Sequence, residues 1–308
     1  MPDTRLPLVF HPDYDTPLPD GHSFPMDKFR RLHEHLLTEG VAEPRQFRLP
    51  EPIDRRQIEL VHDPDYVTSY LEGTIDERAM RRIGLPWTPS AVRRTLVAAG
   101  GTLLTARLAL DHGLACNTAG GTHHAFHDFG SGFCIFHDMA IALRVLLGEG
   151  RIARALVIDC DVHQGDGTAE IFRDEDAVFT FSIHGATNFP RVKMRSDLDV
   201  ALPDDTDDDA YLDALGERLP GLLDRVAPDL VFYDAGVDPH RDDRFGKLGL
   251  TDEGLERRDR YVLETCTAAG RATACVIGGG YARDIDVLVR RHAILHRVAT
   301  SIYDGLHP

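Results

Sequence analysis

Residues 155–163, Ala-Leu-Val-Ile-Asp-Cys-Asp-Val-His, decide the fold class of this chain. The first part of the run is short and apolar, which is typical of a strand buried on both faces of a sheet. From Asp159 to His163 a polar side chain then stands at every second position, the period of an extended chain leaving the sheet. Together the two parts predict a parallel sheet with a polar site at its edge.

Similar apolar runs recur along the chain with helical patterns between them. Strands are predicted at 114–117, 155–159, 178–183, 230–233 and 274–277, and helices at 90–112, 138–148, 209–226, 251–269 and 284–300. We expect the Pro-rich stretches 6–25 and 42–52 to be ordered surface loops. The alternation predicts an α/β fold, a three-layer α/β/α sandwich around a mostly parallel sheet.

The bulk properties restrict the class of protein. A length of 308 residues allows one or two domains, and the absence of a repeat or flexible linker favours a single domain over residues 1–308. No apolar run approaches the roughly 18 residues of a membrane span. The acidic, Pro-containing N-terminus does not resemble a signal peptide, and five scattered cysteines without a CxxC pair suit reduced thiols. We therefore expect a cytoplasmic protein.

The net charge of −16 bears on partners. It argues against direct nucleic-acid binding, which requires Lys and Arg side chains, and it favours cationic substrates. The acidic run 204–209 is predicted to be a solvated loop before a helix.

Five polar segments begin where predicted strands finish: 118–127, 159–167, 182–189, 234–243 and 278–281. Open α/β sheets bind ligands at this edge, so the convergence predicts an active site.

Within 159–163, Asp159, Asp161 and His163 are expected to face the same way and suit a divalent metal. An Asp-rich strand end also fits capping of the next helix, for which Asp166 is placed. The neighbouring motifs favour chemistry. His123 and His124 stand side by side after two glycines, and Tyr281 follows three glycines, where its hydroxyl can reach a site.

With these residues the chain resembles the histone deacetylase family, which includes acetoin-utilisation proteins and acetylpolyamine amidohydrolases. The resemblance covers nearly the whole chain and rests on GGTHHA (120–125), SGFC (131–134), DCDVHQGDGT (159–168), FSIH (181–184), DAGVD (234–238) and GGGY (278–281). It implies the arginase/deacetylase fold and hydrolysis of an acyl, most simply acetyl, group from a lysine-like primary amine.

The resemblance also implies residue roles. Asp161, His163 and Asp238 become ligands of zinc, and the same set also suits Fe²⁺. His123 and His124 become the general acid/base pair, oriented by Asp159 and Asp166, so that Asp159 is not itself a zinc ligand. Tyr281 becomes the donor that polarises the acyl carbonyl. A structural potassium ion is implied at Asp159, Asp161, His163, Ser182 and the backbone around Ile183.

For the substrate, the resemblance implies a narrow channel walled by Phe133 and Phe189, with Gly132 allowing close approach; ordinary core packing is the alternative for both rings. Many relatives carry an Arg-Pro-Pro stretch before the His pair, whereas residues 118–121 here are Thr-Ala-Gly-Gly, as in the bacterial and class IV branch. This departure leaves the acyl-chain length open. Asp63 fits either a rim anchor for substrate or a helix-initiating acid.

Other functions remain open from the sequence. An acetylpolyamine or another small amide is an alternative substrate. A two-manganese, arginase-like ureohydrolase is the nearest different enzyme, but the acids at 234 and 238 are four apart, which favours one metal. A binding protein for acyl-lysine that lacks turnover is the alternative of another class. The sequence does not indicate an oligomeric state.

Overall fold

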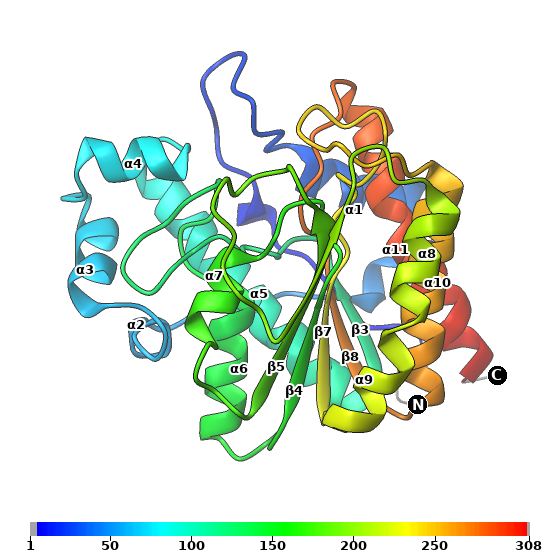
Figure 1. Cartoon of the computed structure of the whole chain (residues 1–308). Coiled ribbons are helices and arrows are strands. Elements are labelled where there is room, and N and C mark those ends of the chain that lie inside the picture. Colours follow the sequence, from blue (N-terminus) through cyan, green and yellow to red (C-terminus); the bar gives the residue numbers. More distant parts are fainter. Residues whose placement is uncertain (1–4, 307–308) are drawn as a thin grey trace.

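The computed structural model describes residues 5–306, whose centre is an eight-stranded sheet (Figure 1). The strand order is β2-β1-β3-β8-β7-β4-β5-β6, and every neighbouring pair is parallel. The strands are β1 (Leu8–Val9), β2 (Phe47–Arg48), β3 (Leu114–Asn117), β4 (Ala155–Asp159), β5 (Val178–Gly185), β6 (Leu198–Leu202), β7 (Leu230–Asp234) and β8 (Ala272–Val276). The predicted mostly parallel sheet is thus confirmed, and it is parallel throughout.

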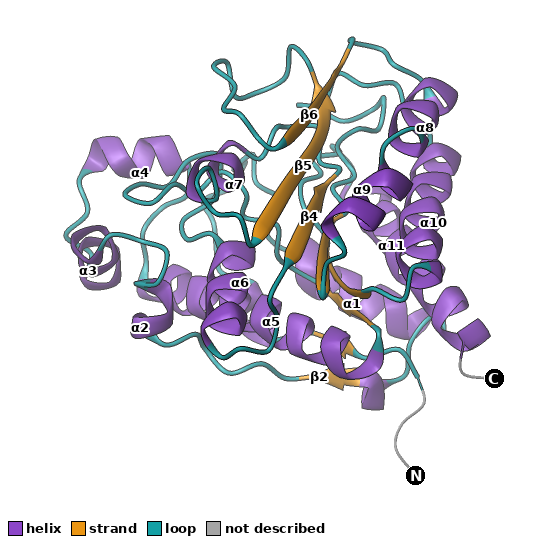
Figure 2. Ribbon diagram, turned by 60° about the horizontal axis from the view of Figure 1, so that its bottom comes forward, coloured by secondary structure: helices purple, strands orange, loops and turns teal. Residues whose placement is uncertain are grey.

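Helices cover both faces of the sheet, which makes the expected three-layer sandwich (Figures 1 and 2). One layer contains α5 (Pro89–His112) and α6 (Asp138–Gly148), with α2 (Arg55–Ile58), α3 (Pro64–Glu72), α4 (Glu77–Ile83) and α7 (Asp166–Ile171) around them. The other contains α1 (Lys28–Thr38), α8 (Asp208–Gly216), α9 (Leu219–Val226), α10 (Asp252–Ala268) and α11 (Ile285–Leu306). None of the helices within residues 5–306 is long and apolar enough to cross a bilayer.

The long helix α5 shows how local sequence sets these elements. Thr88 caps its start, accepting a hydrogen bond from Ala91 N, and Pro89 occupies the first turn, where no backbone donor is needed. Gly113 ends the helix at a φ of +85°, a conformation that glycine adopts without steric cost. Strand β3 begins at the next residue, so the chain turns directly back into the sheet.

Two sequence predictions are wrong. The single helix predicted at 209–226 is two helices, α8 and α9, because Pro220 lacks an N–H donor and starts a new helix. The stretches 6–25 and 42–52 are not only surface loops. They contain β1 and β2, and Leu8 and Val9 are fully buried against β3. A two-residue strand between prolines has too little periodicity to be recognised.

Buried neutral histidines make the fold acid-sensitive. Both ring nitrogens of His62 make hydrogen bonds: Nδ1 donates to Phe126 O at 2.9 Å, and Nε2 accepts from His137 N at 2.9 Å. Burial lowers the pKa of His62 to about 4, below the usual value near 6.5. The unfolded chain therefore binds more protons below pH 6.5, and stability falls as the pH drops from 6.5 towards 4.

We expect His62 alone to cost about 2 kcal/mol of the free energy of unfolding between pH 7 and pH 5. Thermal or urea unfolding of metal-free protein at the two pH values measures this loss. His62→Gln should be less stable at pH 7 and should show a smaller loss on acidification. His112→Gln, which changes an exposed histidine, is the matched control and should retain the wild-type pH dependence.

Candidate metal and catalytic site

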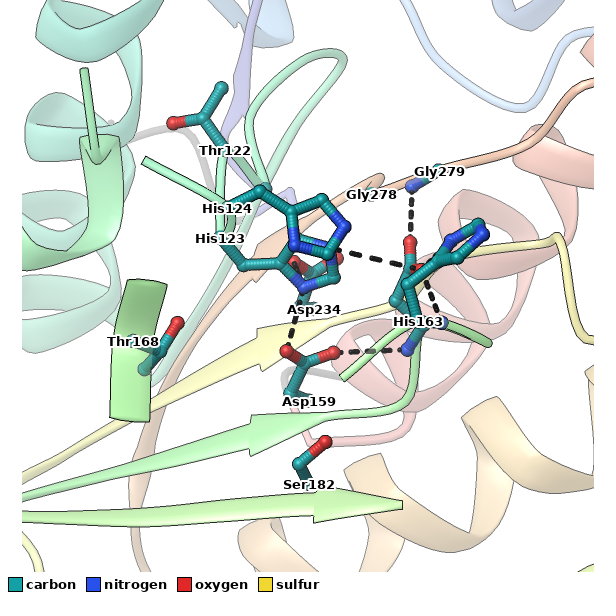
Figure 3. A network of polar contacts seen from close by, with 12 residues as sticks. Thr122, His123, His124, Asp159, His163, Thr168, Ser182, Asp234, Gly278 and Gly279 are labelled. Atoms are coloured by element: carbon teal, nitrogen blue, oxygen red, sulfur yellow. Dashed lines mark hydrogen bonds and ion pairs between the residues drawn. The ribbon is translucent and has the colours of Figure 1, made fainter. Parts of the chain in front are cut away.

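The five polar segments do meet at the carboxyl edge of the central strands. Figure 3 shows side chains from the loop after β3 and from the ends of β4 and β7 gathered in one cluster, together with Gly278 and Gly279 of the loop after β8. Strand register explains this, because Asp159 pairs with Asp234 on one side and with Ser182 on the other. The active-site edge expected from the sequence is therefore formed by neighbouring strands.

Asp161, His163 and Asp238 form a buried group whose ligand atoms all lie within 4.8 Å of one another. Nδ1 of His163 lies 3.0 Å from Asp161 Oδ1 and 3.2 Å from Asp238 Oδ2. Asp238 is fully buried, and its Oδ2 accepts no hydrogen bond among the described residues. A buried carboxylate oxygen without a donor is costly unless a cation binds it.

These residues fit zinc. Ligand atoms about 2.0 to 2.1 Å from a tetrahedral zinc lie about 3.3 Å apart, close to the two distances from His163 Nδ1. Burial alone would lower the pKa of His163, but the hydrogen bond to Asp161 and the negative charges of Asp161 and Asp238 outweigh burial and raise the pKa to about 10. The pocket therefore strongly favours positive charge. His and carboxylate donors suit zinc and Fe²⁺ alike.

Backbone packing holds the acidic pair in place. Gly279 N donates to Asp161 Oδ2 at 2.7 Å, and a Cβ on Gly279 would come within 2.2 Å of Asp238 Oδ2. A side chain at Gly279 would thus displace a metal-facing oxygen. Val162 N donates to Asp238 Oδ1 at 2.8 Å, which leaves Oδ2 as the free atom of that carboxylate.

The histidine pair divides into one charged and one neutral ring. His123 Nδ1 donates to Asp159 Oδ2 at 2.7 Å, and His124 Nδ1 donates to Asp166 Oδ1 at 2.6 Å. Although burial lowers the pKa of His123, the charges of Asp159 and Asp161 hold it well above 6.5. Burial, reinforced by the charge on His123, lowers the pKa of His124 to about 4. Opposed pKa shifts of this kind suit an acid and a base in one site.

Asp234 lies within the DAGVD motif but had no predicted role of its own. It is fully buried, both carboxylate oxygens lack hydrogen-bond donors among the described residues, and Oδ2 lies 4.0 Å from His123 Nδ1. Asp234, Asp159 and His123 form a second group of potential ligands. His123 Nδ1 is already engaged with Asp159, so the group around His163 is the better candidate for a metal site. The signal for Asp234 was its position at the end of a central strand.

Tyr281, on the loop after β8, lines the same cavities as His163 and Asp161. Its ring lies 6.4 Å from that of His163 and 4.9 Å from that of Phe245, centroid to centroid. Its backbone is held at both ends, since Tyr281 N donates to Asp243 Oδ2 and Arg244 Nε donates to Tyr281 O, each at 2.7 Å. Burial, with the charges of Asp161 and Asp238, raises the pKa of Tyr281 well above 10, so its hydroxyl remains a proton donor.

A cavity of about 590 Å³ opens onto this cluster, and Gly132, Phe133, Phe189, His124 and Tyr281 are among its lining residues. Phe189 is 45% exposed and meets the His124 ring edge-on at 4.9 Å. Gly132 has a φ of +53°, and a Cβ there would come within 2.6 Å of His124 Cδ2. The predicted channel residues are therefore brought together.

Asp63 does not line this cavity. Its carboxylate caps α3 by accepting from Asp65 N and Tyr66 N, which supports the helix-initiating alternative.

The residues expected at a potassium site also lie together, because Ser182 is beside Asp159 in the sheet. Its hydroxyl is hydrogen-bonded to His184 Nδ1 at 2.9 Å, so the backbone around Ile183 is the better source of ligands. The potassium site stays a prediction.

Three buried cations behind the site were not predicted. Lys28 Nζ donates to Gly278 O at 3.1 Å, and Lys28 and Arg94 line a small inner cavity beside Tyr281. Arg258 is fully buried and donates to Cys160 O and Gly236 O, tying together the two loops that carry the acids. Each lies in an amphipathic helix, where a cation ordinarily faces water, so the sequence carried no signal.

Comparison with known proteins identifies the family of the chain. Residues 22–294 match the histone deacetylase domain family. An uncharacterized protein of Picosynechococcus sp. is 60% identical over 97% of this chain and 99% of its own. Histone deacetylase 2 of Arabidopsis thaliana is 28% identical over 91% of this chain and 76% of its own.

Among solved structures, acetylpolyamine aminohydrolase from Burkholderia pseudomallei superposes with a TM-score of 0.77 at 23% identity, covering 95% of this chain and 98% of that one. At that identity the similarity shows the fold. With the family match over most of the sequence, it leads to one conclusion: the chain belongs to the histone deacetylase family and has the arginase/deacetylase fold.

Proposed function

We propose that this protein is a zinc-dependent deacylase that hydrolyses the amide of an acyl-lysine-like amine, with the whole chain acting as one catalytic domain. The family membership supports a deacetylase-type hydrolase. The observation that carries the zinc assignment is the buried group of His163, Asp161 and Asp238, with an unpartnered oxygen on Asp238.

Asp161, His163 and Asp238 would hold the metal. When bound, zinc lowers the pKa of water and polarises an acyl carbonyl, so that water attack on an amide becomes feasible near neutral pH. The two carboxylates would offset the charge of the ion, and three protein ligands would leave a position for water or substrate.

The remaining steps fall to residues around that group. His124 is neutral and bonded to Asp166 through Nδ1, so its Nε2 is free to accept the proton of the attacking water. The Tyr281 hydroxyl donates a hydrogen bond to the oxyanion that develops on the acyl carbon. His123, which is cationic beside Asp159, supplies positive charge and a proton near the leaving amine.

The competing functions differ in what they require of these residues. A second metal at Asp234 would favour a ureohydrolase, but His123 Nδ1 already bonds Asp159 there. A binding protein without turnover would not need an opposed acid/base pair next to a donor tyrosine. An acetylpolyamine remains an alternative substrate, supported by the similar fold of acetylpolyamine aminohydrolase.

The test is turnover on a panel of acetyl-lysine peptides, long-chain acyl-lysine peptides and acetylpolyamines. We expect chelator-sensitive release of free amine from the acyl-lysine peptides, restored by adding back Zn²⁺. Metal analysis should find about one ion per chain. Two ions per chain with urea release from guanidino substrates would instead support the ureohydrolase, and tight acyl-lysine binding without turnover would support the binding protein.

A further inference from the structure

The mouth of the catalytic cavity has a charge opposite to that of the whole chain. The chain has 50 acidic residues against 34 Lys and Arg residues, a net charge of −16. The residues that line the cavity include Arg82, Arg244 and Lys247, and none of them is Asp or Glu. The overall charge, which favoured cationic substrates, is therefore a poor guide to this surface.

Two of these cations have no carboxylate partner within 4.0 Å among residues 5–306. Arg244 donates to two carbonyl oxygens, of Tyr281 at 2.7 Å and Ser23 at 2.6 Å. Arg82 lies over the ring of Phe129, 4.3 Å from the centroid. Both residues are exposed. Carbonyls and rings orient the guanidinium groups but do not cancel their charge.

Lys247 is only weakly neutralised. Its Nζ donates to Thr187 Oγ1 at 2.8 Å and lies 4.0 Å from Asp204, and half of its side chain is exposed. Lys193 adds a second positive charge beside the loop that carries Phe189, because its Nζ donates to Pro190 O at 2.9 Å. The loop that carries Phe189 is thus flanked by two lysines.

The walls of the mouth strengthen the effect of these charges. Phe133, Phe189 and Phe245 line the cavity, and their rings exclude water from its sides. Apolar walls around charges of one sign focus the electric field and raise the local concentration of ions of the opposite sign.

We propose that this mouth selects acyl-amines whose carrier bears carboxylate groups next to the acylated amine. The proposal rests on the deacylase function and names its substrate class. Once the acyl-amine stem has entered the channel, the rest of the carrier lies among Arg82, Arg244 and Lys247. Carboxylates are attracted there, whereas the ammonium groups of an acetylpolyamine are repelled.

Matched acetyl-lysine peptides flanked by Asp or by Lys test this preference. We expect kcat/KM to be about tenfold higher for the Asp peptide at low ionic strength, and the ratio to fall towards one as salt screens the charges. Free Nε-acetyl-lysine compared with its C-terminal amide tells whether an α-carboxylate suffices. A preference for the free acid points to a small anionic amide, and a preference confined to Asp flanks points to an acidic protein segment.

Substitutions at the mouth locate the effect. Arg82→Gln should lower the Asp-to-Lys ratio about threefold, and Arg82→Gln with Lys247→Gln should nearly abolish it. Arg81→Gln is the matched control, because Arg81 is one residue away, bonds Glu77 at 3.2 Å and does not line the cavity. It should retain the wild-type ratio.

The charge preference of the mouth and the deacylase function are overturned by different results. Turnover of both peptides with a ratio at or below one, or an acetylpolyamine as the best substrate, overturns the charge preference and leaves the deacylase function standing. The charge preference is also overturned if Arg81→Gln lowers the Asp-to-Lys ratio of kcat/KM as much as Arg82→Gln does. Absence of chelator-sensitive turnover on every substrate overturns both claims.

Discussion

Tyr281→Phe should lower kcat about 100- to 1000-fold while the protein still binds its metal. The variant removes one hydroxyl from a residue that is 8% exposed and whose ring centroid lies 6.4 Å from that of His163. The ring, its packing against Phe245 and the backbone bonds at Tyr281 N and O all remain. Only the donor for the developing oxyanion is lost. Steady-state kinetics on an acetyl-lysine peptide measure kcat, and metal analysis of the same preparation measures the bound metal.

Tyr70→Phe is the matched control. Tyr70 is a fully buried tyrosine, and its hydroxyl contacts Thr95 Oγ1 at 3.3 Å, away from the cluster. It should change kcat less than about twofold. Full turnover in Tyr281→Phe would remove Tyr281 from the proposed mechanism, and loss of metal in that variant would make its role structural.

Asp238→Asn should abolish turnover by weakening metal binding more than about 100-fold, since it removes a proposed ligand and residues that only orient ligands already contribute 10- to 100-fold. Asparagine is nearly isosteric and can still accept from Val162 N, so the backbone contact persists. The change places a neutral amide where the unpartnered oxygen stands. Metal content after dialysis and metal titration followed by calorimetry measure the loss.

The metal-free state provides a second readout for Asp238→Asn. Burial and the charge of Asp161 raise the pKa of Asp238 to about 7, which shows that the fold resists two charged carboxylates there without an ion. Metal-free Asp238→Asn should therefore be at least as stable at pH 8 as the metal-free wild type. Asp197→Asn, at an exposed acid near β6, is the control and should retain metal and activity. Wild-type metal content in Asp238→Asn would contradict the ligand assignment.

Much of the fold was predictable because buried parallel strands leave a strong signal. β3 and β4 have the predicted bounds, and each is apolar enough to be read without its neighbours. The gathering of the candidate site residues was predictable for a related reason. Asp161, His163 and Asp238 follow central strands directly, and parallel strands bring their carboxyl ends to one edge.

What the sequence could not predict depends on contacts between distant segments. Lys28 and Arg258 lie in ordinary helical patterns, and only the packing of α1 and α10 turns them inwards. β1 is too short to show the two-residue alternation of a strand, and it is extended because it pairs with the edge of β3. The charge of the mouth was likewise hidden, since Arg82, Arg244 and Lys247 are far apart in a chain that is acidic overall.

The buried position of Arg258 links the proposed metal site to the docking of a whole helix. The Arg258 guanidinium on α10 donates hydrogen bonds to the carbonyls of Cys160 and Gly236, one in each acid-bearing loop. It also forms a salt bridge with Asp259 Oδ1 at 2.8 Å. If α10 moved away, both loops would lose their shared anchor, and the ligand atoms would no longer be held at ion-binding distance. By thermodynamic reciprocity, a bound ion must then stabilise the docked helix by as much as the docked helix strengthens ion binding. Hydrogen exchange at the amides of α10 would consequently report metal occupancy from outside the pocket.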